Sequence, residues 1–319
     1  MMIKCSRAAF YAAAFGITYL LALLAEVSQS KLEDSTFCFQ KNSVLESLNS
    51  DIIVCETCQK GEGKQKQEHF VLIHGLGHGA WCWYKVVTLL KQKGHRVVAL
   101  DLTSNGINRD ALSDEINSVA HYTDPLLKYL QSLGNDEKVT LVGHSLAGCP
   151  LAYAMEMYPD KISKAIYVAA FTPRNNQSFL SSSFPTVFPR LVASGLVALN
   201  YGKGDSEMPT SASLVLNHIK SFFYTESPEE DINLAASLLT PTPYPISMEV
   251  LNLSSENYGR VRKFYIMLMK DKLFLPEHQQ YSVDQNPPER VFKMHGSDHS
   301  PFFSQPEQLC NLLIHIATL

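Results

Sequence analysis

Downstream of residue 68 the chain carries six short runs of consecutive apolar residues, and stretches with helical periodicity separate most of them. A short apolar run is typical of a strand that is buried on both faces of a parallel sheet. The runs are Phe70–Ile73, Val97–Leu100, Val139–Val142, Ala165–Ala170, Phe264–Met269 and Val291–Met294. Helices are expected at Tyr84–Lys93, Ile116–Leu133 and Leu146–Met157, and at a last helix that Pro306 opens. This alternation predicts an α/β fold with a mostly parallel sheet and helices on both faces.

One interval interrupts the alternation. From about residue 172 to about residue 256 the chain is rich in Ser, Pro, Phe and Leu and shows no convincing strand pattern. Because it is too long for a plain loop, this interval predicts a mostly helical cap inserted between two strands. A cap over the carboxyl edge of the sheet would shape a pocket there. Sheet and cap together predict one domain over residues 69–319.

The first 68 residues differ from the rest of the chain. Residues 31–68 are polar, end in GEGKQKQE and predict a linker or extension. Before them, Lys4 and Arg7 precede the uncharged stretch Ala8–Ala25, which polar residues follow. This order predicts a signal peptide over residues 1–30, and with it the endomembrane system, vacuole or apoplast. An uncleaved signal anchor or an organelle transit peptide is the alternative, and with the latter a plastid or cytoplasmic location.

Composition narrows the choice of partners. The 319 residues are 45% hydrophobic and 18% charged, with a formal net charge of −4. These values are typical of a globular protein and provide no basic field for nucleic acid. The expected partner is a small-molecule substrate, with membrane contact only if the N-terminal segment is retained as an anchor. A second copy of the chain, as in a homodimer, stays open.

The seven cysteines form neither a dense disulfide framework nor paired zinc-ligand spacings. Cys55 and Cys58 make one C-x-x-C without a second pair or nearby histidines, which is weak evidence for a metal, so no zinc site is expected. In an oxidising compartment these two thiols and Cys38 could pair. Asn176 and Asn252 lie in sequons that would then be glycosylation sites.

The candidate nucleophile is Ser145 in VTLVGHSLAG. An apolar strand ends at Gly143 and a helix opens directly after the serine, which is the context of the nucleophile elbow G-x-S-x-G. Ala147 stands where the elbow has its second glycine and adds one methyl group. The alternative is that Ser145 only caps a helix whose glycines pack against the sheet.

A serine nucleophile requires a base, a carboxylate that orients the base, and backbone N–H groups that bind the oxyanion. Asp271 follows the apolar strand FYIMLM, so we expect it at the carboxyl edge of the sheet, with a loop-capping role as the alternative. The loop HGSDH offers His299 as the base, and His295 is its competitor. Asp298 is adjacent to His299 in the sequence and is poorly placed to orient its imidazole, because the side chains of adjacent residues seldom face each other.

The glycine-rich turn HGLGHG follows the first strand, which is where α/β-hydrolases take one oxyanion donor. We therefore expect the backbone N–H groups of Leu76 and Leu146 to bind the oxyanion. A phosphate or dinucleotide loop is the alternative interpretation of this turn. The turn lacks both G-x-G-x-x-G and the Walker lysine, which disfavours that alternative.

With these residues in place, the chain resembles the plant methylesterase family of the α/β-hydrolase superfamily, which includes salicylate-, jasmonate- and alkaloid-ester hydrolases and is related to the α-hydroxynitrile lyases. The resemblance covers about residues 69–319 and leaves out the first 68 residues. It rests on HFVLIHGLGHGAWCWYK, VVALDLTSNGIN, VTLVGHSLAG, KISKAIYVAAF, SPEEDINLAASLL and GSDHSPFFSQPEQL. It implies an α/β-hydrolase with a helical cap, no metal or cofactor, hydrolysis of a small methyl ester, and a triad of Ser145, Asp271 and His299.

The chain departs from the family pattern at several positions. Members commonly carry alanine where Leu76 stands and glycine where Ala147 stands. Members often place a tryptophan in the cap, whereas Trp81 and Trp83 fall on the early helix and are expected in the core. The cap offers other aromatic residues instead: Phe179, Phe184, Phe188, Phe222, Phe223 and Tyr224.

Two other functions stay open. A ligand-binding receptor with vestigial hydrolysis would account for the departures at Leu76 and Ala147. A hydroxynitrile lyase would need the threonine and the lysine that the related lyases carry at the positions of Gly75 and Ser300. Since glycine has no hydroxyl and serine has no positive charge, the sequence favours ester hydrolysis over cyanohydrin cleavage.

Overall fold

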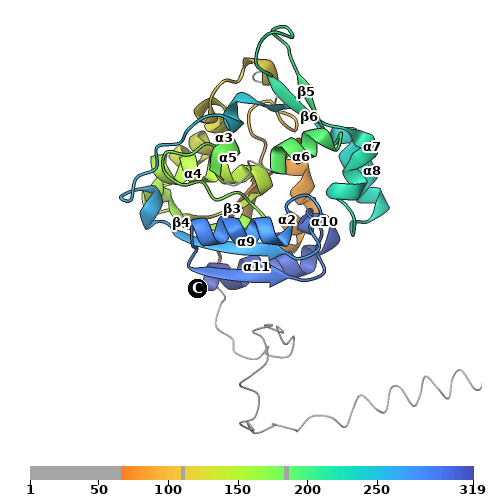
Figure 1. Ribbon diagram of the computed structural model, residues 1–319. Helices are drawn as coiled ribbons and strands as arrows, with labels where there is room; N and C mark the ends of the chain where they lie inside the picture. The colour runs from red at the N-terminus through yellow and green to blue at the C-terminus, as the bar shows by residue number, and fades with distance from the viewer. Residues whose placement is uncertain (1–65, 109–111, 183–186) are drawn as a thin grey trace, which may run out of the picture. The chain divides into compact units, whose positions relative to one another are not determined.

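The computed structural model describes residues 66–108, 112–182 and 187–319 (Figure 1). The expected signal peptide, its apolar stretch Ala8–Ala25 and the C-x-x-C pair lie outside these ranges, as does nearly all of the expected linker. Among the described helices, none combines the length and the apolar character that crossing a bilayer requires.

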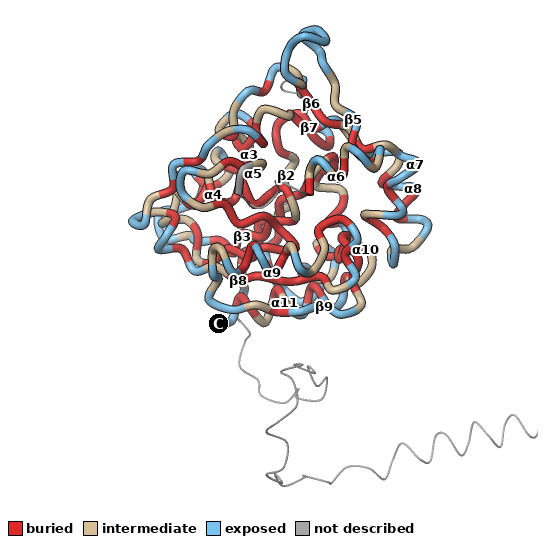
Figure 2. Tube along the Cα trace, in the orientation of Figure 1, coloured by how far each residue is buried: buried red, intermediate tan, exposed pale blue. Residues whose placement is uncertain are grey.

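Six parallel strands form the central sheet, in the order β2-β1-β3-β4-β8-β9. Their bounds are β1 His69–Ile73, β2 Arg96–Leu100, β3 Val139–His144, β4 Ile162–Val168, β8 Arg262–Leu268 and β9 Arg290–Met294. Every strand of this sheet overlaps one of the predicted apolar runs, although β4 begins at Ile162, before its run Ala165–Ala170. Strands β1 and β3 are buried along their whole length, and Figure 2 shows the buried residues concentrated in this layer. The predicted α/β class is confirmed.

Helices pack on the sheet in pairs. Helix α2 lies against α11, α3 lies against α4, and α9 lies on β8. Their bounds are α2 Tyr84–Gln92, α3 Val119–Ser132, α4 Gly148–Met157, α9 Pro276–Gln285, α10 Pro301–Ser304 and α11 Pro306–Thr318. Helix α3 begins later than the expected residue 116, because the Ser118 side chain accepts the His121 N–H and caps the helix there. Single 3-10 turns are η1 Ala80–Trp83, η2 Ser113–Glu115, η3 Ser145–Ala147, η4 Pro159–Lys161, η5 Pro245–Ser247 and η6 Tyr258–Arg260.

The segment between β4 and β8 contains both helices and strands. The helices are α5 Phe179–Ser182, α6 Val187–Ala193, α7 Leu216–Phe222 and α8 Glu229–Leu238. Strands β5 Val197–Asn200, β6 Ser211–Leu214 and β7 Thr242–Pro243 form a separate antiparallel sheet. The expectation that this segment has no strand was therefore wrong, because strands this short show no two-residue alternation. We call the segment the cap; in Figure 1 its strands β5 and β6 lie at the top, away from α9 and α11.

Two buried carboxylates tie the cap to the rest of the domain. Asp231 of α8 accepts hydrogen bonds from Lys85 Nζ at 2.5 Å and from the Tyr84 hydroxyl at 2.8 Å, both at the start of α2. Asp298, in the loop after β9, accepts the backbone N–H of Glu226 at 2.8 Å. A buried charge that lost its partner would cost several kcal/mol (roughly 3–5), so these contacts hold the cap firmly in one position.

Helix α4 approaches the end of β4 too closely for any side chain at residue 148. A Cβ atom on Gly148 would lie 1.7 Å from the carbonyl oxygen of Phe171. The Phe171 N–H also donates to the carbonyl oxygen of Ser145 at 3.2 Å. Gly148 therefore fixes how near the start of α4 comes to the sheet.

We predict that Gly148→Ala lowers the thermal stability by several degrees, because the added methyl group forces the backbone apart at a cost of about 1–3 kcal/mol. Gly134→Ala is the matched control, since a Cβ there would have its nearest neighbour at 4.0 Å. Thermal unfolding followed by circular dichroism measures both variants. Equal Tm values for Gly148→Ala and wild type would contradict the close approach.

Candidate active site

Ser145 has the strained backbone of a sharp turn. It follows β3 directly, opens η3 and has φ = 55°, a left-handed conformation that non-glycine residues rarely adopt. The N-cap of η3 is His144, so the alternative in which Ser145 is an ordinary helix cap is not supported. Ala147 has φ = −58°, an ordinary helical value, so its extra methyl group imposes no backbone strain.

Two glycines beside this turn leave no space for a side chain of their own. A Cβ on Gly143 would lie 2.5 Å from Cδ1 of Leu151, and a Cβ on Gly75 would lie 2.9 Å from the Cβ of Ser145. Neither position admits a larger residue without a shift of its neighbours. The elbow therefore brings the glycine-rich loop after β1 directly against the serine.

Asp271 and His299 form a buried pair at the carboxyl ends of their strands. His299 Nδ1 donates to Asp271 Oδ2 at 2.6 Å, and both side chains are buried. The other carboxylate oxygen accepts the backbone N–H groups of Leu273 and Phe274, each at 2.8 Å. With Nδ1 as the donor, Nε2 carries the lone pair, and within the described chain this atom has no hydrogen-bond partner. His299 thus has the tautomer that a general base requires.

The competing residues are placed elsewhere. His295 is exposed at the end of β9. The carboxylate of Asp298 accepts the backbone N–H groups of Glu226 and Ser300, so it holds the loop rather than the imidazole of His299. The geometry therefore favours the pair Asp271 and His299 over both alternatives.

A pocket opens beside Ser145, with about 550 Å³ of empty space including its mouth. Most of its lining is apolar, and none of the fourteen lining residues is charged. They are Leu76, Ser145, Leu146, Phe179, Phe188, Leu191, Ala212, Phe223, Thr242, Pro243, Tyr244, Ile246, Ser247 and Leu273. This composition is typical of a site for a neutral, mostly apolar ligand.

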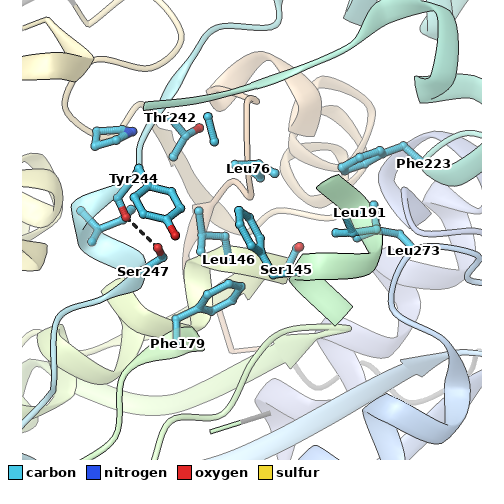
Figure 3. A pocket seen from close by; sticks show the side chains of 14 residues that line it. Leu76, Ser145, Leu146, Phe179, Leu191, Phe223, Thr242, Tyr244, Ser247 and Leu273 are labelled. Carbon is cyan, nitrogen blue, oxygen red and sulfur yellow. Dashed lines mark hydrogen bonds between the residues drawn. The ribbon is translucent and has the colours of Figure 1, made fainter. Parts of the chain in front are cut away.

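Figure 3 shows how the pocket is arranged around the serine. Leu76 and Leu146, the expected oxyanion donors, lie next to Ser145, and Phe223 and Leu191 lie on the side opposite Tyr244. The N–H of Leu146 lies in the first turn of η3, where helical N–H groups lack intrahelical acceptors.

The aromatic residues expected in the cap divide into two groups. Phe179, Phe188 and Phe223 line the pocket, whereas Tyr224 is buried behind it. Phe184 lies outside the described residues, and Phe222 packs against the core. Trp83 is fully buried, and Trp81 is partly buried and stacks on His78. Sequence reasoning did not find Thr242, Tyr244 or Ser247, because nothing in their local sequence marks them as pocket residues.

Three histidines that sequence reasoning left without a role are buried beside the pair. His144 Nε2 donates to the carbonyl oxygen of His299 at 2.7 Å, and the two rings lie 4.6 Å apart. His74 and His78 belong to the loop after β1. Burial lowers the pKa of all three, that of His78 to about 3, so these imidazoles stay neutral near pH 7. His144 fixes the backbone that carries the base; its only sequence signal is its place before Ser145.

No cluster of three or more His, Cys, Asp or Glu side chains in the described ranges has an arrangement that would hold a metal ion. The three cysteines of these ranges, Cys82, Cys149 and Cys310, are buried free thiols.

The neutral histidines predict a steep loss of stability in acid. In the unfolded chain a histidine titrates near pH 6.5, so below that pH the unfolded state binds protons that the folded state excludes. Each such histidine then removes about 1.4 kcal/mol of unfolding free energy per pH unit, and for His78 this continues down to about pH 3. Urea unfolding at pH 8, 6 and 5 measures the slope.

His144→Gln keeps a hydrogen-bond donor for the His299 carbonyl but cannot be protonated. We expect its stability to fall less steeply between pH 6 and pH 5, by about 1.4 kcal/mol, which corresponds to one proton. An identical slope in the variant and the wild type would show that His144 is not held neutral by burial.

Comparisons with known proteins show the family to which the chain belongs. A model of the alpha/beta hydrolase family matches residues 70–312. Methyl jasmonate esterase 1 of Vitis vinifera is 40% identical over 257 residues, which cover 79% of this chain and 98% of that protein. The crystal structure of polyneuridine aldehyde esterase has a TM-score of 0.71 at 33% identity and covers 79% of this chain and 100% of its own. The chain therefore belongs to the alpha/beta hydrolase family, among its plant methylesterases.

A further relative extends the likeness toward the N-terminus. An Arabidopsis thaliana protein named as a chloroplastic methylesterase is 37% identical over 280 residues, or 88% of this chain. Residues 69–319 make up less than four fifths of the chain, so this match reaches upstream of His69. The expectation that the first 68 residues fall outside the resemblance was therefore wrong for this relative. The chain spans 63% of the relative's length.

Proposed function

We propose that this protein is a serine carboxylesterase that hydrolyses the methyl ester of a small, neutral plant hormone or specialised metabolite. The observation that carries the proposal is the buried pair of Asp271 and His299 at the same sheet edge as a strained serine that opens into an uncharged pocket. The names of the relatives, which include a methyl jasmonate esterase and a polyneuridine aldehyde esterase, support the same reaction class.

In the proposed mechanism, the Ser145 hydroxyl attacks the ester carbonyl carbon while His299 Nε2 accepts its proton. Asp271 holds the imidazole in position and stabilises the imidazolium. The N–H groups of Leu76 and Leu146 stabilise the oxyanion of the tetrahedral intermediate. His299 then gives the proton to the departing methoxy oxygen, so that methanol leaves, and water releases the acid from Ser145 by the same steps.

The pocket defines the class of the acyl group. No side chain in its lining is charged, so a charged acyl group would lose its hydration there and gain no opposite charge in return. Among the polar groups, Ser247 Oγ donates to the Tyr244 carbonyl oxygen at 2.6 Å. The Tyr244 hydroxyl is a hydrogen-bond donor at neutral pH, because a tyrosine titrates at about pH 10 and burial raises the pKa of this one further. We infer an apolar acyl group with one carbonyl or hydroxyl oxygen that Tyr244 can bind.

Cyanohydrin cleavage is not part of the proposal. Gly75 has no hydroxyl, and a Cβ atom there would lie 2.9 Å from Ser145 Cβ and 3.1 Å from His144 Nδ1, so the threonine that related lyases carry would require these neighbours to shift. Ser300 is buried and offers no positive charge for a departing cyanide.

We predict that the purified protein releases free acid from at least one ester in a panel of methyl salicylate, methyl jasmonate, methyl indole-acetate and alkaloid carbomethoxy esters. Mass spectrometry of the acids measures the reaction. Ser145→Ala should abolish it, and Asp271→Asn should lower kcat by about 10⁴-fold, because the imidazole loses its correct tautomer. Turnover that survives in Ser145→Ala would assign the chemistry to another group and favour a receptor with incidental hydrolysis.

We propose a plastid location in place of the secretory route. The support is the relative named as chloroplastic, whose likeness reaches into the residues before His69. Full-length protein made in vitro should enter isolated chloroplasts and become resistant to added protease, whereas a chain that begins at Glu68 should stay outside. Uptake into endoplasmic reticulum microsomes without uptake into chloroplasts would restore the signal-peptide interpretation.

A further inference from the structure

The loop after β1 places Leu76 in the lining of the pocket. The carbonyl oxygen of Gly75 accepts from His74 Nδ1 at 3.0 Å and from the His78 N–H at 3.3 Å. The Leu76 N–H belongs to the same peptide plane and points the opposite way, because the two groups are antiparallel in a trans peptide. Within the described residues this N–H has no acceptor, although buried backbone N–H groups are nearly always paired.

The next peptide group, between Leu76 and Gly77, is held at both ends. Its carbonyl oxygen accepts from His78 Nδ1 at 2.7 Å, and its N–H donates to Thr242 Oγ1 at 2.8 Å. The carbonyl oxygen of Gly77 accepts the backbone N–H of Thr240 at 2.9 Å. Thr240 and Thr242 both belong to the cap, so the cap holds the loop by two hydrogen bonds at Gly77, the residue after the proposed oxyanion donor.

A second cap residue acts through His78. The Nδ1 atom of His78 must carry the proton, because it donates to a carbonyl oxygen, and burial keeps the ring neutral with a pKa of about 3. Nε2 is therefore an acceptor, and the hydroxyl of Tyr224 donates to it at 2.7 Å. Tyr224 is fully buried and is not part of the pocket lining, so its hydroxyl reaches the loop only through this imidazole.

The cap segment that holds the loop, residues 240–242, is itself hydrogen-bonded to the body of the domain. Asn105 Nδ2 donates to Thr240 Oγ1 at 2.8 Å and to the carbonyl oxygen of Pro241 at 3.1 Å. The hydroxyl of Tyr122 in α3 donates to Asn105 Oδ1 at 2.8 Å. The cap residues that contact the loop are thus also held by Asn105 and Tyr122, which belong to the body of the domain.

We propose that Tyr224 and Thr242 are positioning residues of the cap, which fix the Leu76–Gly77 peptide and thereby aim the Leu76 N–H at the oxyanion. This inference rests on the proposed esterase function and adds to it that the cap completes the catalytic site as well as enclosing it. An oxyanion donor stabilises the transition state more than the ground state, so a misaimed N–H lowers kcat and leaves KM nearly unchanged.

The test compares variants that remove one hydroxyl each. Thr242→Val removes the acceptor for the Gly77 N–H at nearly constant shape, and Thr242→Ser retains it. Tyr224→Phe removes the donor to His78 at a place remote from substrate. Tyr84→Phe is the matched control, because it removes a hydroxyl from a different contact between body and cap, the one with Asp231.

With p-nitrophenyl acetate as substrate, we expect kcat to fall about 10- to 100-fold in Thr242→Val and Tyr224→Phe, with KM within about threefold of wild type. Thr242→Ser, which retains the acceptor, should keep clearly more of kcat than Thr242→Val, and the control Tyr84→Phe should stay within about twofold of wild type. The affinity for an alkyl trifluoromethyl ketone, which forms a tetrahedral adduct with the serine, should fall in proportion to kcat/KM. Circular dichroism and Tm confirm that each variant is folded.

The inference is overturned if kcat is unchanged in folded Thr242→Val and Tyr224→Phe, or if Thr242→Ser loses as much activity as Thr242→Val. A loss confined to KM would equally overturn it, since that would place these residues in substrate binding alone. A wild-type protein that neither hydrolyses the ester nor binds the ketone would instead overturn the proposed function.

Discussion

The left-handed backbone of Ser145 is the constraint on which the rest of the site depends. A non-glycine residue at φ = 55° costs about 1–2 kcal/mol, and such strain persists only where the surroundings enforce it. Here the enforcement comes from glycines that let their neighbours approach closely: Gly148 meets the backbone of Phe171, Gly143 meets the side chain of Leu151, and Gly75 meets the Cβ of the serine itself. The turn presents the hydroxyl to the pocket between the loop after β1 and the start of α4, where two N–H groups are available.

Burial determines which charges the site retains. The histidines around the serine are neutral because desolvation disfavours their charged forms, and the pocket lining has no charged side chain. The carboxyl group of Asp271 is also buried, but it is paired with His299 and accepts hydrogen bonds from two backbone N–H groups. In a low-dielectric environment of this kind a single carboxylate and a few oriented dipoles act strongly on a developing oxyanion and imidazolium. The proposed preference for a neutral substrate has the same origin.

The sequence predicted the central sheet and the candidate triad because both follow local rules. Strands buried on both faces appear as apolar runs, and Asp271 and His299 could be found because each follows such a run. The cap strands β5 to β7 are too short to give a pattern. The contacts of His144 and His78 could not be predicted from the sequence either, because they join residues 155 and 146 positions apart along the chain. Such contacts arise only when the cap and the sheet edge come together in the folded protein.

The central claim is that Ser145 is a nucleophile whose oxyanion lies between the N–H groups of Leu76 and Leu146. A crystal structure of the protein after reaction with an alkyl fluorophosphonate tests this most directly, because the tetrahedral phosphorus resembles the intermediate. The account predicts one adduct, on Ser145 Oγ, with its phosphoryl oxygen about 2.7–3.1 Å from both backbone nitrogen atoms. An adduct on another residue, or a phosphoryl oxygen that points away from Leu76 and Leu146, would contradict it.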